Sequence, residues 1–353
     1  MNTPDQILGS KIAVTSTAAK VTAPSTNPDP SSKTDSLFRA WSSAWNQFWF
    51  RSEDPTILAL IRIFTGSVVV YAHLVWSSEL LTFFGDDGVL PSGYRHLLFG
   101  RSDFAWSHFD VVHSATAIWA IHWIGLIILG LFTVGVGTRA TAVLSALLVI
   151  SYANRATGAL FGLDQIMGFL CLYLAVGNSG GALSIDRWLA KRRQRRTSSA
   201  GQGRGVDFSL TGIKRDVSTN IAIRLIQIHM CIVYLFAGLG KLQGETWWNG
   251  QAIWYSLASY EYQTLDMTWM ANHMWLVSLI TLFTVAWEVS YVALIWPRLT
   301  RPFMLLFAIP IHLAIGLGMG MMTFGLIMLI GNLAFVSPER IGRWTNWRPD
   351  SVG

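Results

Sequence analysis

The chain has 353 residues, of which 52% are hydrophobic and 13% are charged, about half the charged share of an ordinary soluble domain. Its 17 tryptophans and 31 glycines accompany this apolar excess, and both residue types are frequent in membrane proteins. The net charge of +6 is not gathered into a basic stripe on a soluble domain, which argues against a nucleic-acid partner. The composition predicts an all-α fold, a polytopic transmembrane helix bundle with the lipid membrane as its surroundings.

The N-terminal segment is polar before any apolar run begins. Residues 1–35 are rich in Ser, Thr, Pro, Lys and Asp and hold no apolar signal-peptide core, so we expect a disordered cytoplasmic tail. Residues 36–50 then carry an aromatic stripe with helical spacing, in a segment too short to cross a bilayer of about 30 Å. This pattern predicts an amphipathic helix lying on the membrane, with a soluble amphipathic helix as the alternative. The stripe consists of Phe38, Trp41, Trp45 and Phe48.

Eight apolar segments of helical character follow within residues 52–336, the predicted membrane domain. The third, seventh and eighth are short for a bilayer of about 30 Å. The segments are Pro55–Trp76, Thr116–Val136, Thr141–Tyr152, Gly158–Asn178, Asn220–Leu239, Met274–Trp296, Phe303–Gly318 and Met321–Val336.

Positive charge alternates between the segments that connect these spans. With the N-terminus placed in the cytoplasm, cytoplasmic segments hold 20 Lys and Arg residues and outer segments hold four. Because such a bias sets the orientation of membrane proteins, we expect a multi-pass cell-membrane protein with both termini, including the tail 337–353, in the cytoplasm. Residues 186–218 form a predicted basic cytoplasmic loop, whose charged cluster at 191–196 anchors the topology and offers a contact for acidic lipids.

Four ionisable side chains fall inside the predicted spans, where burial is costly and either a partner or a function is expected. They are Arg62, Asp164, Arg224 and Glu288. Counting about 1.5 Å per residue puts the two arginines and the glutamate at similar depths near the cytoplasmic side. We therefore expect structural ion pairs there, with Glu288 bound to Arg224 or Arg62.

One face of the fifth span carries polar or small residues along its whole length. Their spacing of three and four residues puts them on one side of a helix, which favours either a seam between helices or a site. Lys241, at the outer end, either extends its amine to the interface or, partly desolvated, acts as a base near neutral pH. We expect it to face a cavity with Tyr234 and Gly238, where the glycine leaves room for a flat ring. The full set is Arg224, Gln227, Cys231, Tyr234, Gly238 and Lys241.

The remaining reactive residue types each allow two interpretations. His312, near the middle of the seventh span, is either a packing residue or a catalytic one. Cys171 and Cys231 lie inside apolar runs, and no Cys or His pair has metal-ligand spacing, so no metal site is predicted. The Gly-Asp-Asp-Gly sequence at 85–88 is typical of a turn, with calcium binding as the alternative.

The segment Tyr234–Leu242 reads Tyr-Leu-Phe-Ala-Gly-Leu-Gly-Lys-Leu. It resembles the membrane core of vitamin K-dependent gamma-carboxylases and, more broadly, the bacterial HTTM (horizontally transferred transmembrane) domain. The resemblance extends over about residues 52–336. The pair Asn154-Arg155 departs from it, since the carboxylases carry an Asn-His pair there. Further matching pieces are Phe84–Pro91, Asp164, Ser184–Asp186, Trp247, Trp248, Gly250, Glu288, Thr300–Pro302 and Ile311–Ile315.

This resemblance implies a chemistry. In the carboxylases, the lysine that matches Lys241 deprotonates vitamin K hydroquinone, which reacts with oxygen and so drives the carboxylation of glutamate. The resemblance therefore implies a quinol cofactor, with Lys241 and His312 as catalytic residues. The residues implied to bind the cofactor are Tyr234, Gly238, Asn154, Arg155 and Asp164.

Two functions of different classes follow from these patterns. One is a carboxylase-like enzyme with an outward-facing quinol cavity and a lipid-soluble or small peptide substrate. The other is a non-catalytic membrane scaffold, or a partner in the maturation of a small secreted peptide, in which Lys241 only reaches the interface. A transporter is disfavoured because the sequence shows no inverted repeat.

Overall fold

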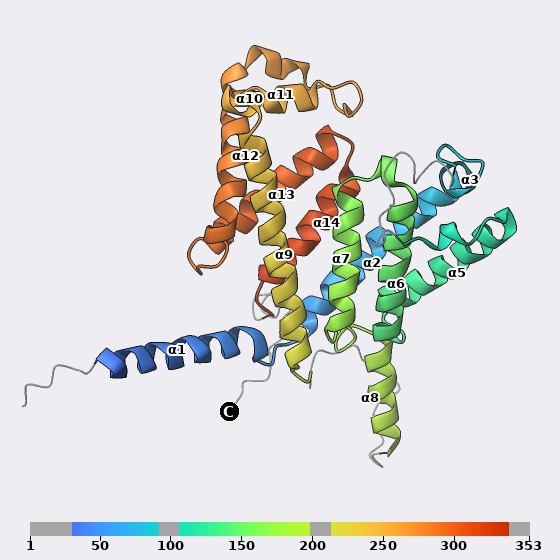
Figure 1. The fold of residues 1–353 in the computed structure, drawn as a ribbon, viewed down its shortest axis with the longest axis vertical. Helices are drawn as coiled ribbons and strands as arrows, with labels where there is room; N and C mark the ends of the chain where they lie inside the picture. Colours follow the sequence, from blue (N-terminus) through green and yellow to red (C-terminus); the bar gives the residue numbers. More distant parts are fainter. Residues whose placement is uncertain (1–29, 92–105, 198–212, 339–353) are drawn as a thin grey trace, which may run out of the picture. The chain divides into compact units, whose positions relative to one another are not determined.

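The computed structural model describes residues 30–91, 106–197 and 213–338 (Figure 1). In these ranges the chain forms helices, and the one strand-type pairing described is an isolated antiparallel bridge between Glu53 and Asp216. The all-α prediction is therefore confirmed for the described part of the chain. Most of the predicted N-terminal and C-terminal tails and part of the basic loop lie outside it.

Eight apolar helices occupy the eight segments predicted from the sequence. They are α2 (Thr56–Ser77), α5 (Ala115–Val134), α6 (Thr138–Arg155), α7 (Gly162–Val176), α9 (Val217–Leu242), α12 (Met274–Leu294), α13 (Arg301–Gly318) and α14 (Met322–Asn332). Five of them, α2, α5, α9, α12 and α13, are long and apolar enough to cross a membrane. The 15 residues of α7 and the 11 of α14 make only about 22 and 16 Å of helix, so the number of complete spans stays a prediction.

Shorter helices connect or flank these eight. They are α1 (Pro30–Phe50), α3 (Leu80–Phe84), η1 (His108–Asp110), η2 (Thr157–Ala159), α8 (Ile185–Thr197), α10 (Glu245–Trp248), α11 (Ala252–Leu257), η3 (Thr268–Asn272) and η4 (Leu333–Phe335). The aromatic N-terminal helix thus begins at Pro30 rather than at Ser36. The basic segment predicted as a loop begins as the helix α8.

Helix α1 presents a row of exposed aromatic side chains. Phe38, Trp41 and Trp45 are each at least half exposed, and the two tryptophan rings stack with their centroids 5.7 Å apart. An exposed aromatic face of this kind is what a helix lying in the headgroup region of a bilayer requires. Its contact with a membrane stays a prediction.

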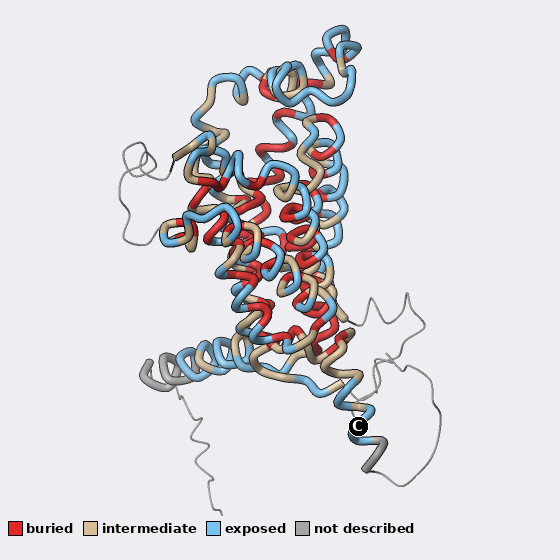
Figure 2. Tube along the Cα trace, turned by 90° about the vertical axis from the view of Figure 1, so that its right-hand side faces the viewer, coloured by how far each residue is buried: buried red, intermediate tan, exposed pale blue. Residues whose placement is uncertain are grey.

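Helix α2 lies at the centre of the bundle and packs against α5, α7, α9 and α14. The other large contacts join α5 to α6, α6 to α7, α7 to α9, α9 to α12 and α13 to α14. Figure 2 shows the buried residues gathered along the inside of these helices. Gly325 lets α14 approach the carbonyl of His312 on α13, where a Cβ atom would collide with that oxygen. Small residues at such crossings are typical of helix packing in membranes.

Contacts between loops divide the connections into two groups, one at each end of the helices (Figure 1). At the end where α2, α6 and α9 begin, Glu53 pairs with Asp216, and Asp186 binds the first residues of α6. At the opposite end, Arg155 in the last turn of α6 donates to the carbonyl of Gly85. The apolar helices therefore alternate in direction, as the charge pattern predicts. The compartment that each end faces stays a prediction.

Arg62 is fully buried in α2 and takes its partners from the loop after α7. Its guanidinium donates to the carbonyls of Ser179 and Leu183, each at 2.5 Å. Gly135, whose φ is +76°, lies against this group, and a Cβ there would be 3.0 Å from the arginine Cζ. The predicted pairing of Arg62 with Glu288 is wrong, because the loop after α7 folds over the arginine and supplies carbonyl oxygens instead.

Asp186, at the start of α8, caps the N-terminus of α6 from a distance in the sequence. Its carboxylate accepts hydrogen bonds from the backbone N–H groups of Gly137 and Thr138, both at 2.9 Å, and from the Thr138 hydroxyl at 2.7 Å. Burial by itself raises the pKa of this carboxyl, but these hydrogen bonds and the charge of Arg62 outweigh it and lower the pKa. The carboxylate form therefore stabilises the junction of α6 and α8.

We predict that Asp186→Asn lowers the midpoint of thermal unfolding in detergent at pH 7, by a loss of about 1 kcal/mol. A carboxyl whose pKa is lower in the folded state stabilises the fold above its unfolded pKa, and loses this effect as the pH falls through the folded value. The difference between parent and variant should therefore shrink as the pH is lowered from 7 towards 3. Asp87→Asn, at an exposed site, is the control. A difference that does not change with pH would contradict the capping role.

The topology is testable with single cysteines, because the native Cys171 and Cys231 are both buried and free. We predict that Asp87→Cys, an exposed position beyond α2, reacts with a membrane-impermeant maleimide in intact cells. Lys214→Cys, exposed just before α9, should react only after the membrane is permeabilised. The parent chain measures background labelling. Equal labelling of both positions in intact cells would contradict the predicted orientation.

Candidate functional site

The last turn of α9 places Lys241 against α12, where it forms an ion pair with Glu288. The amine Nζ donates to the two carboxylate oxygens at 2.6 and 2.8 Å. The glutamate side chain is 9% exposed and the lysine side chain 23%, so the pair is largely shielded from solvent. The prediction that Glu288 binds Arg224 or Arg62 is wrong, since both arginines bind other groups.

The error in that prediction comes from the stagger of the two helices. The sequence argument set the inner ends of α9 and α12 level. In the structure α12 extends only about 9 Å beyond Glu288, to Leu294, whereas α9 extends about 36 Å from Lys241 back to Val217. Helix α12 is therefore displaced towards the Lys241 end of α9, and Glu288 meets Lys241. Arg224 lies about 25 Å further in along α9.

Gly238 permits this pairing by letting α12 approach α9 closely. A Cβ at this position would lie 2.8 Å from Val289 Cγ2 and 3.0 Å from its backbone nitrogen. The space is therefore filled by α12, and the expectation that Gly238 leaves room for a flat ring is wrong. The glycine instead brings the Lys241 and Glu288 side chains within reach of each other.

A buried hydrogen-bond network from all four later apolar helices surrounds Tyr234. Its hydroxyl accepts from the Asn332 amide at 2.7 Å and lies 3.3 Å from His312 Nε2. His312 Nδ1 is 2.8 Å from the carbonyl of Ala308 and must donate to it, so in the neutral ring Nε2 accepts from the tyrosine. The Tyr291 hydroxyl donates to the Asn332 oxygen at 2.5 Å. The network is closed, with a partner for each of these groups.

The network lies close to the ion pair. The charge of Lys241 acts on His312, and that of Glu288 acts on Tyr234. Trp287, the neighbour of Glu288, packs its ring 5.0 Å from that of Tyr234. The structure thus brings together three of the predicted site residues, Lys241, Tyr234 and His312, around a glutamate that was predicted to lie elsewhere.

Sequence reasoning missed Asn332 and Tyr291 as members of this network. Sequence patterns singled out the four charged residues inside the spans and the polar face of α9, and neither set includes these two residues. Asn332 is a lone amide at the end of an apolar segment, and a buried amide also requires partners in a membrane. That signal was present in the sequence. Tyr291, one turn after Glu288 on α12, gave no signal beyond its spacing.

An apolar pocket of about 360 Å³ opens beside the ion pair, between the end of α9, the short helix α10 and the outer half of α12. Leu242, Trp247 and Trp248 form one side of it. The amine of Lys241 lies 5.2 Å from the centre of the Trp247 ring. Lys241 thus stands behind a wall of the pocket rather than inside it. The volume lies in the range of pockets that bind small molecules.

Three predicted cofactor-binding residues have their partners in the first half of the chain. Asn154 donates to the carbonyl of Trp106 at 2.8 Å. Arg155 is buried and donates to carbonyls of the turn after α3, and Asp164 accepts from the backbone of Phe161 where α7 begins. These hydrogen bonds hold the connection between α6 and α7 and the loop before α5 in place. A role of the three residues in binding a quinol stays a prediction.

The predicted turn at 85–88 follows α3 directly. Within the described residues, Nδ1 of His113 lies 2.7 Å from a carboxylate oxygen of Asp86, at hydrogen-bond distance. No group of three or more His, Cys, Asp or Glu side chains in the described ranges is arranged to hold a metal ion. This segment therefore acts here as a loop contact.

Comparison with known families gives a match for the second half of the chain. Residues 198–340, somewhat less than half of the sequence, match the family model of the HTTM domain. This match contains α9 to α14, the helices that build the ion pair, the buried network and the apolar pocket. No curated protein and no solved structure matches the chain. The second half of the chain is therefore similar to the HTTM domain, and the long apolar helices support an integral membrane protein.

Proposed function

We propose that this protein is a membrane enzyme in which Lys241, held by Glu288, takes a proton from a lipid-soluble substrate that carries a weakly acidic hydroxyl group. A quinol is the substrate class that suits the site. The proposal rests on one observation, a shielded Lys–Glu pair beside an apolar pocket at the outer end of α9.

The pair offers a way to hold a lysine as a base. The pair can exist in two forms: an ammonium beside a carboxylate, or a neutral amine beside a carboxylic acid. Apolar surroundings disfavour separate charges and so reduce the free-energy difference between the charged form and the neutral form. The neutral amine can then accept the proton of a quinol hydroxyl, whose pKa, like that of other phenols, is close to that of a free lysine. The proton moves from the hydroxyl oxygen to Nζ, the acid form of Glu288 releases its proton to solvent, and the carboxylate that results stabilises the new ammonium. The bound quinol would supply electrons to oxygen.

The pocket fits a flat apolar ring. Its walls are mostly hydrophobic, and Trp247 and Trp248 offer aromatic faces for stacking.

The competing function is a membrane scaffold, or a partner in the maturation of a small peptide. The close approach at Gly238 favours it, because the same ion pair clamps α9 to α12. Under this alternative the pair stabilises the fold and does nothing else. The two functions differ in what happens when the charges are exchanged between the helices.

We predict that Lys241→Met lowers quinol-dependent oxygen uptake by purified protein by about 100-fold or more, because the base is lost. The variant should also lose stability, on the order of 3 kcal/mol, since Glu288 is left buried without its partner. Oxygen uptake with vitamin K hydroquinone and thermal unfolding are the two measurements. No uptake by the parent protein would favour the scaffold.

The double variant Lys241→Glu/Glu288→Lys separates the roles. It restores a pair of opposite charges, so part of the lost stability should return in the unfolding measurement. The amine now projects from α12, away from its original position, so oxygen uptake should stay at the level of Lys241→Met. Recovery of uptake together with stability would contradict a specific base at position 241.

A further inference from the structure

A second pocket, of about 490 Å³, lies at the opposite end of α9, which is the predicted cytoplasmic end. Its lining comes from the segment before α2, the start of α9, the turn between α12 and α13, and the residues after α14. Four arginines line it, and Glu53 is the one carboxylate among its described lining residues. The arginines are Arg51, Arg224, Arg298 and Arg301.

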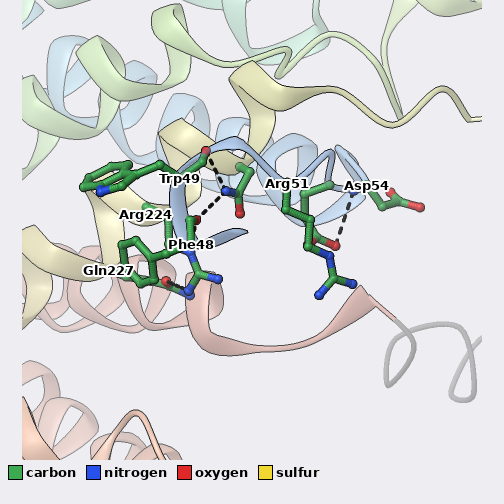
Figure 3. Close-up of polar contacts among 8 residues, drawn as sticks. Phe48, Trp49, Arg51, Asp54, Arg224 and Gln227 are labelled. Atoms are coloured by element: carbon green, nitrogen blue, oxygen red, sulfur yellow. Dashed lines mark hydrogen bonds and ion pairs between the residues drawn. The ribbon is translucent and has the colours of Figure 1, made fainter. Parts of the chain in front are cut away.

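Arg224 is held rigidly at the wall of this pocket (Figure 3). Its Nε donates to the carbonyl of Phe48 at 3.2 Å, and one terminal nitrogen donates to the Gln227 oxygen at 2.8 Å. The guanidinium also lies over the Phe48 ring, 4.3 Å from its centre. Asn220 fixes the same backbone turn through the carbonyls of Phe48 and Trp49. These groups are neutral, so the positive charge of Arg224 is not balanced by them.

Arginines predominate among the charged residues that line the pocket in the described part of the chain. Arg51 reaches Glu53 only at 3.9 Å, and the partners of Arg301 include the carbonyls of Ile295 and Trp296. The positive charges of Arg301 and Arg51 act against the charged form of Arg224, while the negative charge of Glu53 stabilises that form. Among the described lining residues, arginines thus outnumber carboxylates by four to one. Holding like charges together in this way costs free energy that a bound anion would recover.

We propose that this arginine pocket binds the phosphate group of an anionic phospholipid in the adjoining membrane leaflet. Guanidinium groups match phosphate oxygens in charge and in geometry, because each offers parallel N–H donors. Basic pockets between transmembrane helices on the cytoplasmic side are suited to acidic headgroups. Ile57, Ile223 and Phe335 line the same pocket and offer apolar contacts for the first part of the lipid tails.

The proposed lipid site is separate from the Lys241 site. About 25 Å of α9 lies between Arg224 and Lys241, and the two pockets share no lining residue. A bound lipid would bridge segments that are far apart in the sequence, since the pocket joins residues near 51, 224, 298 and 335. Binding should therefore stabilise the folded protein whether or not the outer site is catalytic.

The test uses the full-length protein, purified in detergent and depleted of anionic lipid. Phosphatidylglycerol is titrated in, and bound lipid is counted by native mass spectrometry while thermal unfolding is followed in parallel. We expect saturable binding and a higher unfolding midpoint with phosphatidylglycerol, and neither with phosphatidylcholine, whose choline cancels the phosphate charge. For Arg51→Gln/Arg298→Gln, which removes two exposed pocket charges, the affinity for phosphatidylglycerol should fall by about 10-fold or more.

The matched control is Arg139→Gln/Lys214→Gln, which removes the same charge from exposed positions at the same end but outside the pocket lining. It should bind phosphatidylglycerol like the parent. An equal loss of affinity in both double variants would overturn the proposal, because surface charge alone would explain the binding. Inorganic phosphate at millimolar concentration is the last probe. If it reproduces the stabilisation and displaces the lipid, the pocket binds free phosphate and the lipid proposal fails.

Discussion

An ionisable side chain buried among membrane helices must find its partner within the protein, because no water is there to receive it. The buried charged residues of this chain have two kinds of partner. Arg62 and Arg155 are fully buried and bind backbone carbonyls of nearby loops. Lys241 and Glu288 bind each other. The positions of the loop after α7, of the loop after α3, and of α12 relative to α9 all depend on these contacts.

The two kinds of partner differ in the net charge that remains. A carbonyl satisfies the hydrogen-bond donors of an arginine but leaves its net charge in place, whereas the Lys241–Glu288 pair is neutral as a whole. The same difference separates the ends of α9. At the outer end, a neutral pair borders an apolar pocket. At the other end, Arg224 binds neutral groups and lines a polar pocket together with three further arginines.

The existence and order of the apolar helices could be predicted from the sequence because they depend on local apolar runs and helical periodicity. Their ends were less accurate: α7 begins at Gly162, where Asp164 caps it, and not at Gly158. The partner of Glu288 could not be predicted, since it depends on how far α12 slides along α9. That displacement depends on the pair itself and on the packing at Gly238 and around Tyr234, which no single segment encodes.

The polar face of α9 also looks different once its neighbours are known. The sequence suggests one continuous stripe from Arg224 to Lys241, but the structure divides it between two environments. The inner part, Arg224 and Gln227, binds the Phe48 carbonyl and the Ala334 carbonyl. The outer part, from Tyr234, faces α12, α13 and α14. The same face of α9 thus packs against other segments in its first half and contributes to the candidate site in its second half. The spacing of the polar residues is the same in both halves, so it could not distinguish a packing face from a site.

The closed network around Tyr234 limits how the proposed base could work. Both nitrogens of His312 have partners, and Asn332 uses its amide donors on Tyr234 and on the carbonyl of Met328. A proton leaving Lys241 would have to break these bonds to travel inward. In the opposite direction no such bonds have to break, because the lysine side chain is 23% exposed and contacts Glu288. We infer that His312 positions Tyr234, rather than carrying the proton, and that proton exchange at Lys241 proceeds through Glu288 to the outer surface.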